Sequence, residues 1–132
     1  MAGHQTLDQR RAAHAWRVVQ QVKDEGRDDA RREFKLQAKR LPARVVTAGL
    51  GQALAFLEAK DYAPHLRAAL TDWIGQQVLV APGRTGDRLL RWVVEGDSDF
   101  LRLATAECLV YLQWVVRFAE AEFRDISDVE EV

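Results

Sequence analysis

Residues 97–123 read DSDFLRLATAECLVYLQWVVRFAEAEF, a stretch that contains neither glycine nor proline. At the helical period of 3.6 residues per turn, its apolar side chains share one broad face and leave only a narrow polar stripe. A helix this long and this apolar buries such a face only when other helices pack around it. The stretch therefore predicts an all-α protein. The predicted apolar face comprises Phe100, Ala104, Cys108, Tyr111, Leu112, Val115, Phe118 and Ala119.

Two apolar residues, Leu109 and Val116, interrupt the polar stripe of this helix. The stripe otherwise consists of Arg102, Thr105, Gln113, Arg117 and Glu120. Apolar side chains on a solvated stripe either touch a neighbouring helix at its edge or belong to a surface that meets another protein. We therefore keep Leu109, Val116 and Arg117 as candidate residues of a protein interface.

Three helices are predicted in the first half of the chain. A capping box that starts at Thr6 marks the beginning of the first helix, which extends to Lys23. Asp28 begins a second helix, because acidic residues are favoured in the first turn of a helix. Pro42 breaks this helix or starts the third one, which continues to Lys60.

The second half of the chain adds two helices before the long one. A fourth helix runs from Pro64 to Val78, since proline suits the first turn of a helix. Residues 81–86, APGRTG, have the composition of an exposed loop. A short fifth helix covers residues 87–95, and Asp97 or the serine after it caps the sixth.

Length and composition fit one helical domain. The chain has 132 residues, enough for one core but not for a catalytic domain beside a binding domain. We expect a single compact bundle of about six helices over residues 1–132, with flexible ends at residues 1–5 and 124–132. No apolar run could span a membrane, no secretory signal is visible, and the single cysteine cannot build a disulfide framework. These features favour a cytoplasmic protein.

Charge is distributed unevenly, with a basic region before Arg44 and an acidic C-terminal end. Four cations recur at a spacing of four residues in the second helix, where like charges repel one another. A protein that tolerates this repulsion presents cations to phosphates, or it merely has a solvated helix face moderated by nearby aspartates. The candidate RNA-binding residues are Arg27, Arg31, Lys35 and Lys39, the adjoining Arg32, Arg40 and Arg44, and Arg10, Arg11 and Arg17 of the first helix.

Catalytic constellations are missing from the sequence. The histidines His4, His14 and His65 are scattered, no glycine-rich phosphate loop is present, and Cys108 lies on an apolar helix face as a small hydrophobe. The acidic residues around Asp97 sit at a helix junction, where capping is the better interpretation than metal binding. We therefore expect a protein that is not an enzyme and that uses no metal and no cofactor.

Glu107 is a carboxylate on the apolar side of the long helix. A buried carboxylate needs a partner, so it either accepts hydrogen bonds from a helix end, an indole N–H or an arginine, or it is a general acid with a raised pKa. No second acid or histidine lies near it in sequence, which favours the structural interpretation.

Small and aromatic residues receive structural interpretations too. Gly49 and Gly51 lie in a helical pattern, where small residues allow another helix to approach closely. The four tryptophans occupy apolar positions, so filling the core is a better interpretation than stacking on bases. We except Trp92, because it adjoins the predicted loop. The tryptophans are Trp16, Trp73, Trp92 and Trp114.

Three motifs in a fixed order resemble a known family. They are KRLP at residues 39–42, GLGQALAF at residues 49–56, and ATAE at residues 104–107 leading to YLQW at 111–114 and RFAE at 117–120. In this order and spacing they resemble the small helical subunit of type III-B CRISPR effector complexes, the Cmr complexes. The likeness extends from about Thr6 to Phe123.

The resemblance implies a non-catalytic subunit that acts in antiviral defence. Copies of such subunits stack head to tail along a filament, beside larger effector-complex subunits that hold the guide RNA, and line the groove for guide RNA and single-stranded target RNA. The expected partners are those subunits, both RNAs and further copies of this chain, with no membrane. The alternative is a stand-alone helical adaptor or regulatory protein that binds an acidic protein partner through the same cations.

Overall fold

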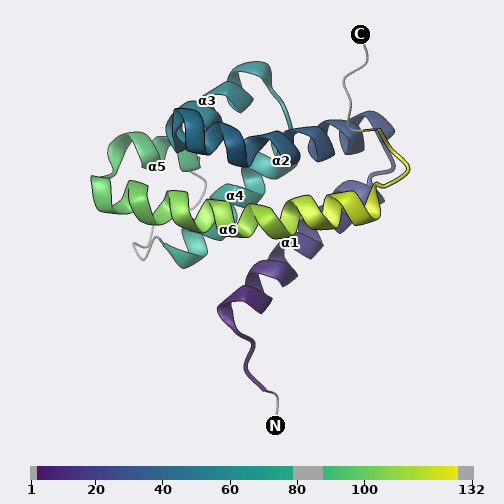
Figure 1. Ribbon diagram of the computed structural model, residues 1–132, viewed down its shortest axis with the longest axis horizontal. Helices are drawn as coiled ribbons and strands as arrows, with labels where there is room; N and C mark the ends of the chain where they lie inside the picture. The colour runs from purple at the N-terminus through teal and green to yellow at the C-terminus, as the bar shows by residue number, and fades with distance from the viewer. Residues whose placement is uncertain (1–2, 79–87, 128–132) are drawn as a thin grey trace.

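Helix α6 (Ser98–Glu122) runs across the molecule, and α1 (Leu7–Asp24), α2 (Asp28–Ala48) and α4 (Pro64–Gln77) pack against it (Figure 1). Helices α3 (Leu50–Lys60) and α5 (Leu89–Glu95) complete the fold, with α3 against α2 and α5 against both α3 and α4. This computed structural model describes residues 3–78 and 88–127. Across those ranges the chain forms helices and no strand, which confirms the all-α prediction.

The apolar face predicted for α6 forms much of the core. Six of its eight residues are buried, and the two phenylalanines are half-buried and packed against the core. The buried residues of α6 are Ala104, Cys108, Tyr111, Leu112, Val115 and Ala119. Burial along nearly the whole length of α6 explains why this stretch of sequence determines the arrangement of the other helices.

The structure contains both of the helix N-caps that the sequence predicted. At the start of α1, Thr6 Oγ1 accepts a hydrogen bond from the Gln9 N–H at 3.0 Å, and Gln9 Oε1 accepts one from the Thr6 N–H at 2.8 Å. At the start of α6, Asp97 Oδ1 accepts from the Phe100 N–H at 2.8 Å. These side chains satisfy backbone N–H groups that have no partner within the helix.

The prediction that Pro42 ends the second helix is wrong. Helix α2 continues through Pro42 to Ala48, because Leu41 and Val45 on either side of the proline are buried in the core and outweigh the one hydrogen bond that proline removes. The break occurs at Gly49, where φ is 91° and ψ is 156°. This conformation is almost restricted to glycine, so Gly49 ends α2 and lets the chain turn into α3.

The short helix α5 fits against its neighbours because two glycines leave room for it. A β-carbon added at Gly51 of α3 would lie 3.3 Å from Val93 Cγ1, and one added at Gly75 of α4 would lie 3.3 Å from an atom of the Trp92 ring. Gly51 thus confirms the predicted close approach of another helix.

Two sequence predictions fall wholly or partly outside the described ranges. The loop predicted at residues 81–86 lies outside them, as does the start of the predicted fifth helix, which begins at Leu89 in the described part. Across the described ranges, no helix combines the length with the apolar character that a transmembrane span requires.

Replacing Gly49 with alanine is expected to lower the free energy of unfolding by about 1–3 kcal/mol, because alanine must adopt the glycine-only backbone conformation. No atom lies within 4 Å of the added β-carbon, so the cost comes from the backbone alone. Urea unfolding followed by circular dichroism measures it. Gly3→Ala, where the added carbon also meets nothing within 4 Å, is the matched control. Equal stability of the two variants would contradict the assignment of the break to Gly49.

Candidate nucleic-acid interface

The cations predicted along α2 divide into those that hold the fold together and those that face solvent. Lys35 belongs to the first group, since its ammonium donates to the carbonyl oxygens of Phe123 at 2.9 Å and Ile126 at 2.7 Å. These carbonyls follow the C-terminal end of α6, where a helix leaves its last C=O groups without partners and favours a cation. Lys35 therefore ties the end of α6 to α2.

Arg31 has a similar structural role at the end of α1. Its guanidinium donates to the carbonyl oxygen of Lys23 and to Asp28 Oδ1, the latter at 3.0 Å. Arg44 lies with its guanidinium carbon 4.0 Å from the centroid of the Phe56 ring and donates to Gln37 Oε1 at 3.4 Å.

The exposed cations of the α2 region are Arg27, Lys39 and Arg40, whereas Arg32 is half-buried. Arg27 precedes the first turn of α2 and pairs with Asp29 at 3.3 Å, but both side chains remain largely in solvent. The side chains of these three residues are therefore accessible to an anion from solvent.

The three cations predicted on α1 also fall into a half-buried group and an exposed group. Arg11 is engaged by Glu107, as described below, whereas Arg10 and Arg17 are exposed. Within residues 3–78 and 88–127, the side chains of Arg10 and Arg17 make no hydrogen bond and no ion pair. They are seven residues apart and therefore lie on the same side of the helix.

Glu107 has the partners that the structural interpretation required. Its carboxylate accepts hydrogen bonds from Arg11 Nε at 2.6 Å and Arg11 Nη2 at 2.8 Å, and from the Trp73 indole N–H at 3.0 Å. Arg11 also contacts Asp8 at 3.3 Å, and Asp8 accepts from the Trp114 indole N–H at 3.0 Å. The predicted arginine and indole partners are thus both confirmed.

The electrostatics of this pair argue against a general acid. Burial raises the pKa of Glu107, but hydrogen bonds from Arg11 and Trp73 outweigh burial and hold the pKa below its usual value. The hydrogen bond to Glu107 raises the pKa of Arg11. A carboxyl group with a lowered pKa stays ionised at neutral pH, so Glu107 joins α6 to α1 and α4 as an ion-paired anchor.

A buried polar network around His14 was missed in the sequence. His14 Nδ1 lies 2.6 Å from the Tyr111 hydroxyl oxygen, and His14 Nε2 lies 2.7 Å from Asp72 Oδ2. The Trp73 ring stacks on the Tyr111 ring with centroids 5.6 Å apart, and burial raises the pKa of Tyr111. The sequence did contain a signal that His14 is buried, because it lies four residues before Val18 on the buried side of α1.

Cys108 is fully buried, and burial raises the pKa of its thiol to about 12. This confirms its interpretation as a small hydrophobic residue. Among the residues that the structure describes, no group of three His, Cys, Asp or Glu side chains could hold a metal ion.

Leu109 and Val116, which interrupt the polar stripe of α6, are partly buried and pack against the core. Each side chain thus contacts the core and keeps part of its surface in solvent. Arg117 remains exposed and pairs with Glu120 at 2.9 Å.

The prediction that tryptophans fill the core is confirmed for Trp73 and wrong for Trp16, whereas Trp114 is half-buried and packs against the core. Trp73 and Trp92 are buried, so the exception made for Trp92 is wrong as well. Trp16 is 43% exposed, because α1 turns its neighbours Ala15 and Val19 toward the core and leaves Trp16 at the margin of its buried face. The Trp16 ring meets Phe118 edge-on, with centroids 5.2 Å apart and planes at 81°.

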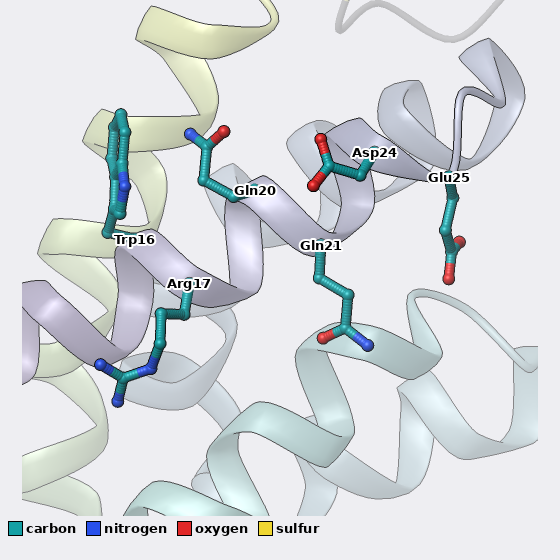
Figure 2. A pocket seen from close by; sticks show the side chains of 6 residues that line it. All are labelled: Trp16, Arg17, Gln20, Gln21, Asp24 and Glu25. Atoms are coloured by element: carbon teal, nitrogen blue, oxygen red, sulfur yellow. The ribbon is translucent and has the colours of Figure 1, made fainter.

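A shallow pocket of about 520 Å³ lies along the exposed side of α1, beginning at Trp16 (Figure 2). Two rows of side chains border it, and the rows point to opposite sides of the helix. One row is Trp16, Gln20 and Asp24, and the other is Arg17, Gln21 and Glu25.

Comparison with known proteins identifies a family and a relative. The family model described as CRISPR-associated protein (Cas_Cmr5) matches residues 7–122. The CRISPR system Cmr subunit Cmr5 of Thermus thermophilus is 32% identical over 112 residues, which make up 81% of this chain and 90% of that protein. The family match begins with the first residue of α1 and ends with the last residue of α6.

Proposed function

Because the chain belongs to the Cmr5 family of CRISPR-associated proteins, we propose that it is the non-catalytic small subunit of a type III-B (Cmr) RNA-guided effector complex. The observation that carries this proposal is the family match over residues 7–122, which includes every helix of the described part. The relative from Thermus thermophilus bears the name of a Cmr subunit, and it is matched over 90% of its length. The proposed protein is a single domain that works in the cytoplasm in antiviral defence.

The proposed contact with guide and target RNA is electrostatic. The cations that face solvent are Arg10, Arg17, Arg27, Lys39 and Arg40. Phosphate contacts position RNA without reading its bases, so sequence specificity would come from pairing between guide and target. Arg11, Arg31, Lys35 and Arg44 are half-buried, which makes them less available for RNA than the exposed cations. Arg32 is half-buried, so it is less available too.

The proposed stacking of copies along a filament needs a protein-facing surface. Arg117 is exposed on α6, and Leu109 and Val116 are partly exposed beside it. The exposed apolar residues Val46 of α2, Val94 of α5 and Leu103 of α6 are further candidates for contact with another copy. Val46 and Val94 are 71% and 75% exposed, more than the other large apolar residues of the described part.

Affinity purification of the tagged protein from its native host tests membership of the complex. The proteins recovered are identified by mass spectrometry, and the RNA retained is sequenced. We expect larger CRISPR effector subunits together with a short guide RNA derived from a CRISPR repeat. Recovery of an unrelated acidic protein without RNA would instead support the adaptor function.

Exchanging Arg27, Lys39 and Arg40 for glutamine in the assembled complex is expected to weaken binding of target RNA by roughly 100-fold at 0.1 M salt, if each cation meets one phosphate. The dependence of log affinity on log salt should become shallower by about 2, since each contact with a single strand contributes about 0.7. Filter binding over a series of salt concentrations measures both quantities.

The matched control exchanges three exposed cations on α3 and α5 or just before α5, namely Lys60, Arg88 and Arg91, for glutamine. The control is expected to keep the affinity and salt dependence of the unaltered complex. Equal losses in both variants would show a general effect of net charge and would refute the assigned RNA surface.

A further inference from the structure

Trp16 is exposed and borders a pocket, although its position in the sequence predicted a core residue. It is 43% exposed although it is among the largest apolar side chains of the protein, and it borders a pocket rather than the core. Its edge-on contact with Phe118 fixes the indole against α6 without covering the whole ring. A partly exposed, immobilised aromatic ring is a platform on which a nucleic-acid base can stack.

The residues around Trp16 have the chemistry that a nucleotide requires. Arg17 follows it in the opposite row, and its guanidinium is free of hydrogen bonds and ion pairs within the described ranges. Gln21 is exposed, and its side-chain amide can both donate and accept hydrogen bonds at the edge of a base. Arg10 extends the positive charge about 10 Å along the helix toward its N-terminus.

The two ends of the pocket differ in charge. Both rows begin with a residue suited to nucleic acid, Trp16 or Arg17, and end with a carboxylate, Asp24 or Glu25. Phosphate is repelled by the acidic end and attracted by the basic end. A volume of about 520 Å³ lies within the range of small-ligand sites, so the pocket can hold one nucleotide but not a folded partner.

We propose that this pocket on α1 holds one unpaired nucleotide of single-stranded RNA, with its base stacked on Trp16 and its phosphate at Arg17. The proposal rests on the proposed RNA-guided function, and it adds to that function a site that recognises a base face. Every base has a π face and can stack on the indole, so the site would bind RNA independently of its sequence.

The test uses effector complex assembled with the variants Trp16→Ala, Trp16→Tyr and Arg17→Gln. Trp16→Ala is expected to weaken binding of single-stranded target RNA by about 5- to 140-fold, the range for loss of one stacked base, with an unchanged salt dependence. Trp16→Tyr keeps an aromatic face and should restore most of the affinity. Arg17→Gln should make the salt dependence shallower by about 0.7.

Leu101→Ala, which shortens an exposed apolar residue in the first turn of α6, at the other end of the helix from Phe118, is the control for general loss of surface contact. Unchanged RNA affinity of Trp16→Ala, while the variant of Arg27, Lys39 and Arg40 loses affinity, would overturn the nucleotide site and leave the proposed function intact. Failure of Trp16→Ala to enter the complex would overturn the site as well, because the pocket would then be a protein contact. If neither variant changes RNA binding, both proposals fail.

Discussion

Trp73→Ala is expected to lower the free energy of unfolding by about 3–5 kcal/mol, the range for removing a large aromatic side chain from a core. Trp73 is 2% exposed, stacks on Tyr111 with planes 15° apart, and donates its indole N–H to Glu107. The substitution removes all three interactions and leaves a cavity between α4 and α6. For a chain of this size the melting temperature should fall by about 10–20 °C.

Thermal unfolding followed by circular dichroism measures this loss, and Trp16→Ala is the matched control. The same atoms are removed in both variants, but Trp16 is 43% exposed and should cost far less than Trp73. Equal melting temperatures for the two variants would contradict the assignment of Trp73 to the centre of the core.

Glu107→Leu is expected to lower the free energy of unfolding by about 3 kcal/mol, because it leaves the half-buried Arg11 guanidinium with Asp8 in place of its bidentate partner. We expect the low end of the range for buried pairs, since the side chains of Arg11 and Glu107 are 15% and 12% exposed. Urea unfolding measures the loss. The double variant Arg11→Met with Glu107→Leu removes both charges and should recover most of the stability. A double variant less stable than Glu107→Leu would contradict this account.

The pH dependence of the same pair has a definite sign. The pKa of Glu107 in the folded protein lies below its ordinary value of 4.5, so ionisation stabilises the fold above that value. This stabilisation is lost as the pH falls through the lowered pKa of the folded state. The difference in stability between the natural protein and Glu107→Gln should therefore be constant above about pH 5 and shrink in more acidic solution.

Local signals in the sequence predicted the helices and their caps. The box at Thr6 and the cap at Asp97 depend on residues three positions apart, so no tertiary information is needed to find them. The buried face of α6 follows from periodicity alone. Even the kind of partner for Glu107 was predictable, because few groups can satisfy a buried carboxylate.

The predictions that failed concern contacts that depend on how the helices cross. Periodicity placed Trp16 among the apolar positions of α1, but the crossing of α1 with α6 leaves it at the margin. His14 meets Asp72 and Tyr111, which are 58 and 97 residues away in sequence, and Lys35 meets carbonyls 88 and 91 residues away. Sequence spacing has no information on such pairs. At Pro42, core contacts outweighed a local rule.

The burial of Cys108 makes this protein convenient for site-specific labelling. Its thiol is inaccessible and, with a pKa of about 12, is almost entirely protonated at neutral pH, so maleimides would react with it only slowly in the folded state. A second cysteine introduced on the surface, for example in place of Leu103, would react selectively without prior removal of the native one. Energy transfer between fluorophores attached in this way would test the proposed stacking of copies.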